Sequence, residues 1–378
     1  MRIGIDGLPL TEELTGIGYY TLELANHLAA QADEIQVVSP KAYLSSLTQQ
    51  PERPEKLRLV RSRVSPISRH WWSIGLPRYI RRHGIEVFHG TNFEVPLRRV
   101  CPAVVTIHDL SMLLYPHTQE RKRVRRAQRR LPLMARAATM IITPTESARR
   151  EVHEHLRIPM HRIVAVPEAA RSCFRRLEEE QTISVRSRLG IDQDFLLFVG
   201  TVEPRKNLST LVRAFEEVLR VREKPLLLVI AGRKGWLVDD LYTSLKHSPA
   251  AGSIIFTGYL ADEDLCALYS SCAAFIYPSV YEGFGLPPLE AMTCGAPVIA
   301  GDIPAIKEVV GAAARLISPQ STEDLTRTAI ELLASVSTQV ALSAAGIKRA
   351  EEFSWSRTAS ATRDVYAEAS ERFVHQRD

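Results

Sequence analysis

The chain has 378 residues, 45% of them hydrophobic and 24% charged, a composition that excludes a disordered or fibrous protein and favours two globular domains. Residues 1–175 carry 27 Lys and Arg against 16 Asp and Glu, whereas residues 176–378 carry 21 against 27, so the first half is basic and the second acidic. Either the basic first half meets an anionic surface or substrate, or its charge serves solubility alone. The longest apolar runs are about six residues, far below the roughly 18 of a membrane-spanning helix.

The chain opens on a strand and a turn instead of a signal peptide, and this predicts a cytoplasmic protein. Its five cysteines have neither zinc-ligand nor disulfide spacing. We therefore expect them to be reduced and buried.

Short apolar runs alternate with helical-period segments in both halves, a pattern typical of parallel α/β sheets. In the first half the expected strands are residues 3–5, 35–38, 87–89, 104–107, 140–143 and 163–166. In the second half they are residues 195–199, 226–230, 254–256, 274–277, 298–300 and 315–317. The fold class expected is therefore α/β, with two Rossmann-like doubly wound domains facing across a cleft at their strand ends.

The polar stretch 175–193 separates the two sets of strands, so the linker is expected near residues 170–190. We place the N-terminal domain at residues 1–173 and the C-terminal domain at residues 174–353. The last segment, residues 354–378, has helical spacing and no following strand, so it caps one of the two domains.

Gly16 and Gly18 lie between the first strand and a helix expected at residues 19–30. Glycines there let a loop approach a ligand closely. The spacing of Gly4 and Gly7 is not that of a dinucleotide fingerprint, which weakens a nicotinamide-cofactor interpretation.

His108 and Asp109 follow the strand expected at residues 104–107. A histidine at a strand end binds a sugar hydroxyl or acts as an acid or base, although a histidine is more often structural. Asp109 either orients the imidazole or caps the next turn.

Seven of the ten residues from Arg121 to Arg130 are Lys or Arg, and apolar residues at helical spacing face the other way. Such a helix either lies on anionic lipid or presents a solvated basic face. Nucleic acid is not expected as a partner, because no recognised nucleic-acid module accompanies the helix.

Arg205 and Lys206 come just after the strand 195–199 and its following Gly200. A paired cation at a strand end neutralises a leaving diphosphate, with Arg giving a fork of hydrogen bonds and Lys a point charge. The alternative is a solvated loop in which these cations pair locally with Glu203.

The stretch from Glu282 to Glu290 is the most informative in the chain. Gly283 and Gly285 let backbone amides approach a ligand, and the prolines that follow favour a helix start. A helix N-terminus offers free amides and a partial positive charge to an anion. The two carboxylates suit hydroxyl-rich partners, whereas the alternative is a Gly-rich turn beside an ordinary surface helix.

Asp262 and Asp264 match an Asp-x-Asp metal motif, but they precede the helical run 265–272, where carboxylates favour a helix start. We therefore expect no metal site.

From Tyr277 to Asp302 the sequence resembles the signature of family-four retaining glycosyltransferases of the GT-B architecture, whose mark is two glutamates separated by seven residues. The resemblance extends through most of the chain, at residues 16–18, 106–110, 200–208, 231–236 and 256–260. Overall the chain looks most like bacterial mannosyltransferases that build surface polysaccharides. Tyr19 departs from the pattern, since the family commonly has Arg there, and this puts a cationic contact from that loop in doubt.

The resemblance implies an N-terminal acceptor-binding domain, a C-terminal nucleotide-sugar domain and a last helix that returns to the N-terminal domain. It implies that Arg205 and Lys206 hold the donor's phosphates, that Glu290 binds the ribose, and that Glu282 and His108 contact the transferred sugar. The other implied donor-binding residues are Gly16, Gly18, Asp109, Gly200, Gly258, Gly283, Phe284, Gly285 and Leu286.

The activity implied is transfer of a hexose, with mannose from GDP-mannose as the best match, to a glycan or lipid-linked acceptor. Configuration is retained, no cofactor or metal is required, and the protein works in the cytoplasm or peripherally on the inner membrane face. Three alternatives stay open: a transferase using UDP-glucose or UDP-GlcNAc, a nucleotide-sugar epimerase of similar architecture, and a non-catalytic sugar-nucleotide-binding protein.

Overall fold

The computed structural model describes residues 1–31, 33–48, 53–63 and 70–375, and the chain divides into two compact units. The first unit consists of Met1–Leu110, Arg125–Glu168 and Ser354–Asp378, and the second of Ser111–Val124 and Ala169–Phe353. The chain thus passes between the units at residues 168 and 169, a little before the expected boundary at 173. Residues 111–124 belong to the second unit, whereas the sequence analysis assigned them to the first.

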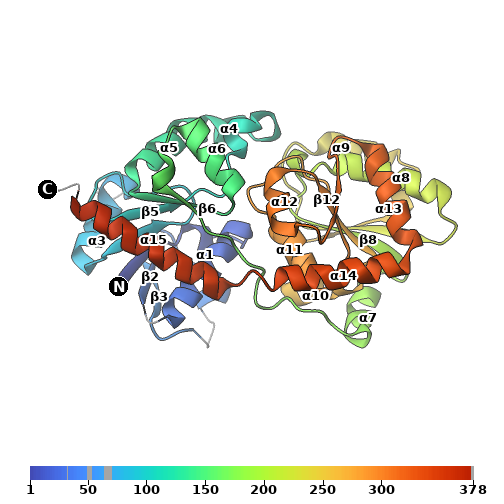
Figure 1. Cartoon of the computed structure of the whole chain (residues 1–378), viewed down its shortest axis with the longest axis horizontal. Coiled ribbons are helices and arrows are strands. Elements are labelled where there is room, and N and C mark those ends of the chain that lie inside the picture. The colour runs from blue at the N-terminus through green and yellow to red at the C-terminus, as the bar shows by residue number, and fades with distance from the viewer. Residues whose placement is uncertain (32, 49–52, 64–69, 376–378) are drawn as a thin grey trace. The chain divides into compact units, whose positions relative to one another are not determined.

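The first unit contains a parallel sheet of seven strands in the order β3-β2-β1-β4-β5-β6-β7 (Figure 1). Its strands are β1 (Arg2–Asp6), β2 (Glu34–Ser39), β3 (Leu57–Arg61), β4 (Val87–Gly90), β5 (Ala103–Thr106), β6 (Met140–Thr143) and β7 (Ile163–Ala165). Strand order runs outward from β1 in both directions, so the topological switch point lies between β1 and β4.

Helices of the first unit cover this sheet. They are α1 (Gly16–Ala30), α2 (Ser45–Thr48), α3 (Leu76–His83), most of α5 (Arg121–Ala137), α6 (Glu146–Leu156) and α15 (Trp355–His375). The last helix packs against α1, β5 and β6, where Val365, Tyr366 and Ala369 are buried at helical spacing. The N-terminal and C-terminal parts of the chain therefore share one unit (Figure 1).

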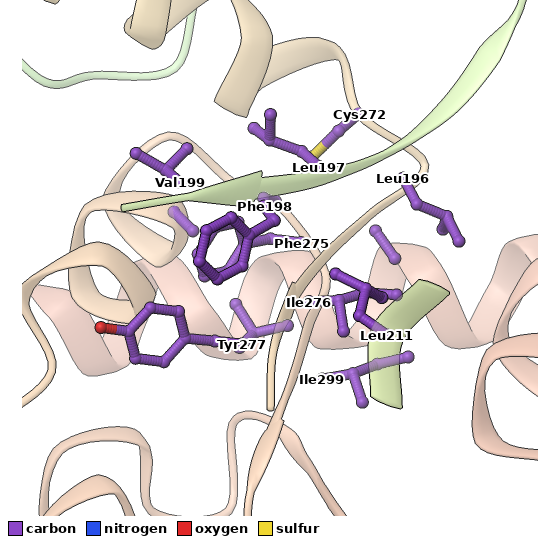
Figure 2. Close-up of a cluster of buried hydrophobic side chains, with 14 of the residues drawn as sticks. Leu196, Leu197, Phe198, Val199, Leu211, Cys272, Phe275, Ile276, Tyr277 and Ile299 are labelled. Atoms are coloured by element: carbon purple, nitrogen blue, oxygen red, sulfur yellow. The ribbon is translucent and has the colours of Figure 1, made fainter. Parts of the chain in front are cut away.

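The second unit repeats the arrangement with six parallel strands in the order β10-β9-β8-β11-β12-β13. Its strands are β8 (Asp194–Val199), β9 (Leu226–Ala231), β10 (Ile254–Gly258), β11 (Ala274–Tyr277), β12 (Val298–Gly301) and β13 (Arg315–Ile317). Figure 2 shows part of its core, which includes Phe198 from β8 and Phe275 and Tyr277 from the neighbouring β11. Both faces of β8 and β11 are buried, which accounts for their continuous apolar sequence.

The second unit also contains nine α-helices among its described residues, and those from α8 to α12 connect its parallel strands. They are α4 (Ser111–Leu114), α7 (Glu179–Arg188), α8 (Leu208–Val221), α9 (Asp239–Lys246), α10 (Asp262–Ser271), α11 (Leu286–Thr293), α12 (Pro304–Val310), α13 (Thr322–Ala334) and α14 (Val336–Ala350). Helix α8 packs with α13, and α11 packs with α14. Helix α7 lies within the stretch that the sequence analysis gave to a linker, and a capping box at Glu178 and Gln181 begins it.

All twelve predicted strands are present, and β3 was missed. Cys101, Cys266, Cys272 and Cys294 are free and buried, but Cys173 is exposed, contrary to prediction. Within the described ranges no single helix combines the length and hydropathy of a membrane span. Among the residues that the structure describes, one pair of helices, residues 322–334 and 336–375, has this length and composition when taken together, but it is bent by 102°.

Candidate active site

Two loops leave adjacent strands at the switch point of the second sheet. Strand β8 ends at Val199, its neighbour β11 ends at Tyr277, and the two strands pair in parallel. Ligands bind open α/β sheets at this point, beyond the carboxyl ends of the strands. The loop after β8 carries Arg205 and Lys206, and the loop after β11 carries Glu282.

The two cations converge on the second loop. Arg205 donates from Nη1 to Glu282 Oε2 at 2.7 Å and to the Tyr281 carbonyl at 2.8 Å, and Lys206 Nζ donates to Glu282 Oε1 at 2.6 Å. Arg205 Nη2 also donates to Glu203 Oε1 at 2.6 Å. Both cations therefore contact the residues just before the turn at 283–285.

The cluster is buried and balanced in charge. Burial opposes ionisation of Glu282, but the charges of Arg205 and Lys206 outweigh it and lower the pKa of this carboxyl to about 2. Burial lowers the pKa of the Lys206 ammonium below its usual value, with Glu282 opposing that shift. Tyr277 adds a hydroxyl contact to Glu282 at 3.0 Å. In this structure Glu203 and Glu282 are thus the counter-ions of the two cations.

Gly285 is required at the start of α11. Its φ is +113°, and a Cβ there would lie 2.5 Å from Ile306 Cδ1, so a larger residue meets both backbone strain and a side chain. No side chain caps this helix, and because Pro287 and Pro288 have no N–H, Leu286 supplies the one backbone amide among its first three residues. Phe284 and Leu286 flank the glycine, Phe284 being buried and Leu286 half-buried.

Two further predicted glycines lie at strand ends of the second sheet, Gly200 just after β8 and Gly258 at the end of β10. Gly200 has φ +150°. Gly232 packs so closely against Gly200 that a Cβ on Gly232 would lie 2.1 Å from the Gly200 carbonyl oxygen. Gly258, with φ +72°, accepts a hydrogen bond from the Gly232 amide at 2.8 Å. These glycines hold the loops after β8, β9 and β10 together.

Glu290 lies one turn into α11, and its carboxylate is buried in an ion pair. Arg171 Nε donates to Oε1 at 2.9 Å, and the hydroxyl of Tyr269 donates to Oε2 at 3.3 Å. Burial raises the pKa of Glu290, although Arg171 opposes that shift. The sequence analysis did not identify Arg171, which is 119 residues away in the chain.

Arg171 also pairs with Asp262, in the first turn of α10, and Asp264 pairs with Arg188. These two aspartates, considered above for a metal, thus each have a cation partner. The residues that the structure describes contain no group of three or more His, Cys, Asp or Glu side chains placed to hold a metal ion.

His108 lies in the first unit, just past β5. Its Nδ1 is 2.8 Å from Glu168 Oε1, its Nε2 is 2.9 Å from the Thr91 carbonyl oxygen, and the ring of Tyr20 meets it edge-on at 4.7 Å. The sequence analysis missed Glu168. Asp109 follows in the chain and is half-buried.

Gly16 and Gly18 do not form a loop. Helix α1 begins at Gly16, three residues before the predicted start, so both glycines lie in its first turn. Space explains Gly18, because a Cβ there would lie 2.9 Å from Leu14 Cδ2 and 3.1 Å from the Pro9 carbonyl oxygen. The feature that this segment presents is therefore the N-terminus of a helix.

Helix α5 is amphipathic as predicted, with Val124, Ala127 and Leu131 buried. Part of its basic face is paired, since Arg126 and Arg130 lie 3.3 Å and 2.7 Å from Glu94 Oε1. Most other cations of the helix are exposed.

The segment Ser111–Val124 is joined to the second unit by aromatic contacts. Tyr115 stacks on Tyr281 with ring centroids 4.8 Å apart, and Trp236 Nε1 donates to the Thr118 carbonyl at 2.9 Å. Tyr281 directly precedes Glu282, so this segment braces the loop that carries the ion cluster.

Two family models match the chain. The family described as Glycosyltransferase Family 4 matches residues 14–169, and Glycosyl transferases group 1 matches residues 180–349. The O-antigen chain mannosyltransferase B of Escherichia coli is 30% identical over 379 residues, which is 97% of this chain and 99% of that protein. The chain belongs to glycosyltransferase family 4.

Other relatives of this glycosyltransferase agree with the assignment. The serotype-specific mannosyltransferase WbdA of Escherichia coli is 31% identical over 226 residues, covering 59% of this chain and 28% of that protein. The Anabaena protein HepE, solved in complex with UDP-glucose, has a TM-score of 0.76 at 16% identity over 97% of this chain and 99% of that one. The predicted family and the GT-B fold, with its two Rossmann-like parallel-sheet domains, are confirmed.

Proposed function

We propose that this glycosyltransferase moves mannose from GDP-mannose to a hydroxyl of a glycan or lipid-linked acceptor, with retention of configuration and without a metal. The observation that carries the proposal is the convergence of Arg205 and Lys206 on the loop before α11. The choice of mannose rests on the Escherichia coli mannosyltransferase that matches nearly the whole chain.

The donor's diphosphate binds at the N-terminus of α11. The partial positive charge at the N-terminus of α11, beside Gly285 and Leu286, attracts it, and the guanidinium of Arg205 and the ammonium of Lys206 neutralise it. Glu282 then exchanges part of its contact with these cations for a hydroxyl of the sugar.

Glu290 receives the ribose. Its Oε1 accepts a hydrogen bond from Arg171 and its Oε2 accepts one from Tyr269, and a carboxylate oxygen accepts more than one donor. Arg171 thus fixes the orientation of the carboxylate while leaving capacity for a diol.

Transfer needs no enzyme nucleophile in this proposal. The bond from the sugar carbon to the phosphate oxygen breaks, the acceptor oxygen bonds to the same face of the sugar carbon, and the departing phosphate oxygen takes the acceptor's proton. Catalysis rests on positioning and on stabilising the negative charge that develops on the diphosphate. The product anomer, measured by proton NMR, tests retention, and an inverted product contradicts it.

The nucleotide is tested by thermal shift with GDP, UDP and ADP and their sugars. A ligand at 100 times its Kd stabilises a protein by about 2.7 kcal/mol, so GDP and GDP-mannose are expected to raise Tm and the others to have little effect. If only UDP-glucose or UDP-GlcNAc raises Tm, that sugar nucleotide is the donor and GDP-mannose is not.

Transfer of labelled mannose to an acceptor glycan then tests the activity. It is expected to persist in EDTA, and loss of turnover that Mg²⁺ or Mn²⁺ restores contradicts metal independence. Release of an epimerised sugar nucleotide without acceptor identifies an epimerase, and donor binding without any turnover identifies a binding protein.

We also propose that the exposed cations of α5 bring the enzyme to an anionic membrane surface. Each cation near such a surface contributes about 1 kcal/mol, so binding to vesicles with anionic lipid is expected at low salt and is lost at high salt. Equal binding to neutral and anionic vesicles, or no binding to anionic vesicles at low salt, contradicts the membrane proposal.

A further inference from the structure

In the first unit, the buried His89 and the half-buried His108 have ring nitrogens that face different kinds of partner. His89, in β4, has Nδ1 2.8 Å from the Tyr366 hydroxyl and Nε2 2.7 Å from Thr106 Oγ1. A hydroxyl both donates and accepts, so a neutral imidazole satisfies both contacts. Burial, to which the charge of His108 adds, lowers the pKa of His89 to about 3. His89 is therefore neutral.

His108 instead faces two acceptors, Glu168 Oε1 at 2.8 Å from Nδ1 and the Thr91 carbonyl oxygen at 2.9 Å from Nε2. A carbonyl oxygen accepts only, and so does an ionised carboxylate. With Glu168 ionised, both ring nitrogens carry a hydrogen, and the ring is an imidazolium.

The surroundings of His108 support this charge. The side chains of His108 and Glu168 are only 17% and 4% exposed, so solvent screens the pair little. Burial alone disfavours the charged ring, but Glu168, the Thr91 carbonyl and Asp109 outweigh it and raise the pKa of His108. The ring of Tyr20 also packs against His108, and the neutral His89 is close enough for its pKa to respond to the charge of His108.

We propose that Glu168 is a positioning residue that holds His108 as an imidazolium with both N–H groups fixed. His108 then supplies a fixed positive charge during transfer and accepts no proton. The acceptor's proton must go to another group, which the departing phosphate oxygen provides. The statement about transfer rests on the proposed function, whereas the statement about the ring's charge does not.

The charge is tested first in the unaltered protein by ¹⁵N NMR of its histidine rings at pH 8, with His108→Asn used to assign the signal. His108 is expected to show two protonated ring nitrogens, and His89 one. A neutral His108 ring, as in a pair whose proton rests on Glu168, overturns the proposal. This measurement requires no variant of Glu168 to fold and no donor to be known.

The role of Glu168 is tested with Glu168→Gln, which keeps an acceptor for Nδ1 but removes the charge. The ring of His108 is expected to lose its proton at lower pH than in the parent. The kcat is expected to fall about 100-fold with little change in KM for the donor, since a charge acting in the transition state is lost. Glu168→Asp, which keeps the negative charge, should restore part of the kcat and part of the pH at which His108 loses its proton.

The matched control is Glu154→Gln, an exposed carboxylate of α6, which should leave both the titration and kcat unchanged. An unaltered titration in Glu168→Gln overturns the proposal. If the parent transfers no sugar from any nucleotide donor, the proposed function fails while the NMR measurement still decides the state of His108.

Discussion

At the scale of single residues, the buried charges of the candidate site make the firmest predictions. Arg205 and Lys206 supply preorganised positive charge in a site from which water is largely excluded. Removing one such donor reduces turnover by about 10² to 10³, so Arg205→Ala and Lys206→Ala should each fall in this range.

Steady-state kinetics with saturating donor measures the effect, with Lys224→Ala, on the exposed surface after α8, as the matched control. A loss of about tenfold or less in both variants would refute the phosphate-binding role. Unfolding experiments on the same variants separate a folding defect from a catalytic one, because each leaves Glu282 with a single cation.

A second prediction concerns Asp6, a carboxyl at the end of β1. Burial raises the pKa of Asp6 from 3.8 to about 7, with Glu94 adding to the shift and the Leu8 amide opposing it. Because folding raises the pKa of Asp6, the protonated carboxyl contributes fully to the stability of the folded protein below pH 3.8, the unfolded pKa. This contribution is lost as the pH rises through the folded pKa of about 7. The loss is on the order of 4 kcal/mol between pH 4 and pH 7.

Asp6→Asn should therefore gain stability relative to the parent between pH 5 and pH 8, as measured by urea unfolding at each pH. Asp240→Asn, on an exposed turn of α9, should show no such trend. A pH-independent difference between Asp6→Asn and the parent would contradict a raised pKa at Asp6.

Residue types at strand ends were predictable from sequence, but their partners were not. The sequence marks His108, Arg205, Glu282 and Glu290 by position after a strand or in a Gly-rich turn. It gives no local signal for Glu168 or Arg171, because each meets its partner across 60 and 119 residues of chain. Only the folded sheets bring such pairs together.

At the scale of elements, α15 makes a testable contribution to the first unit. Tyr366 is fully buried, and its hydroxyl meets His89 Nδ1 at 2.8 Å. Tyr366→Phe removes that partner and leaves a buried nitrogen unsatisfied, which costs about 1–3 kcal/mol. Denaturant unfolding measures the loss, and Tyr242→Phe in α9 is the control, since Tyr242 is only half-buried.

An unchanged midpoint in Tyr366→Phe would mean that solvent or another group replaces the hydroxyl. A larger loss than in the control would establish α15 as a structural part of the first unit.

Elements with a buried apolar face were predicted well, and those without one were not. Strand β3 was missed because it is an edge strand with Arg58 and Arg61 at exposed positions. Helix α1 begins at Gly16, earlier than predicted, because glycine disfavours helix interiors and so did not indicate a helix. Residue 18 is nevertheless a glycine in the helix because close packing there excludes a side chain. Helix α7 was given to the linker because only Thr182 is buried in it.

At the scale of the whole molecule, each unit has its own sheet and core, and we expect two unfolding transitions in calorimetry. Gly285→Ala, which forces φ +113° on a residue with a Cβ, should cost about 1–3 kcal/mol and lower only the second unit's transition. Tyr366→Phe should lower only the first.

A bound nucleoside diphosphate should raise the same transition that Gly285→Ala lowers. A single transition shifted by both substitutions would show instead that the units unfold together.

The two-domain plan was predictable because the strand pattern restarts after residue 193, whereas the assignment of Ser111–Val124 was not. That segment has an apolar run, Met112 to Leu114, which reads as a short helix in either unit. The stacking of Tyr115 on Tyr281, 166 positions along the sequence, decides where it belongs.

The path of the backbone also governs how chimeric enzymes must be built. Most of the second unit is one continuous segment of the chain, Ala169–Phe353, which is inserted within the sequence of the first unit. Exchanging that segment alone between homologues would leave Ser111–Val124 from the wrong parent against Tyr281 and Trp236. A graft that keeps the native contacts must therefore carry both pieces, with four junctions: before Ser111, after Val124, before Ala169 and after Phe353.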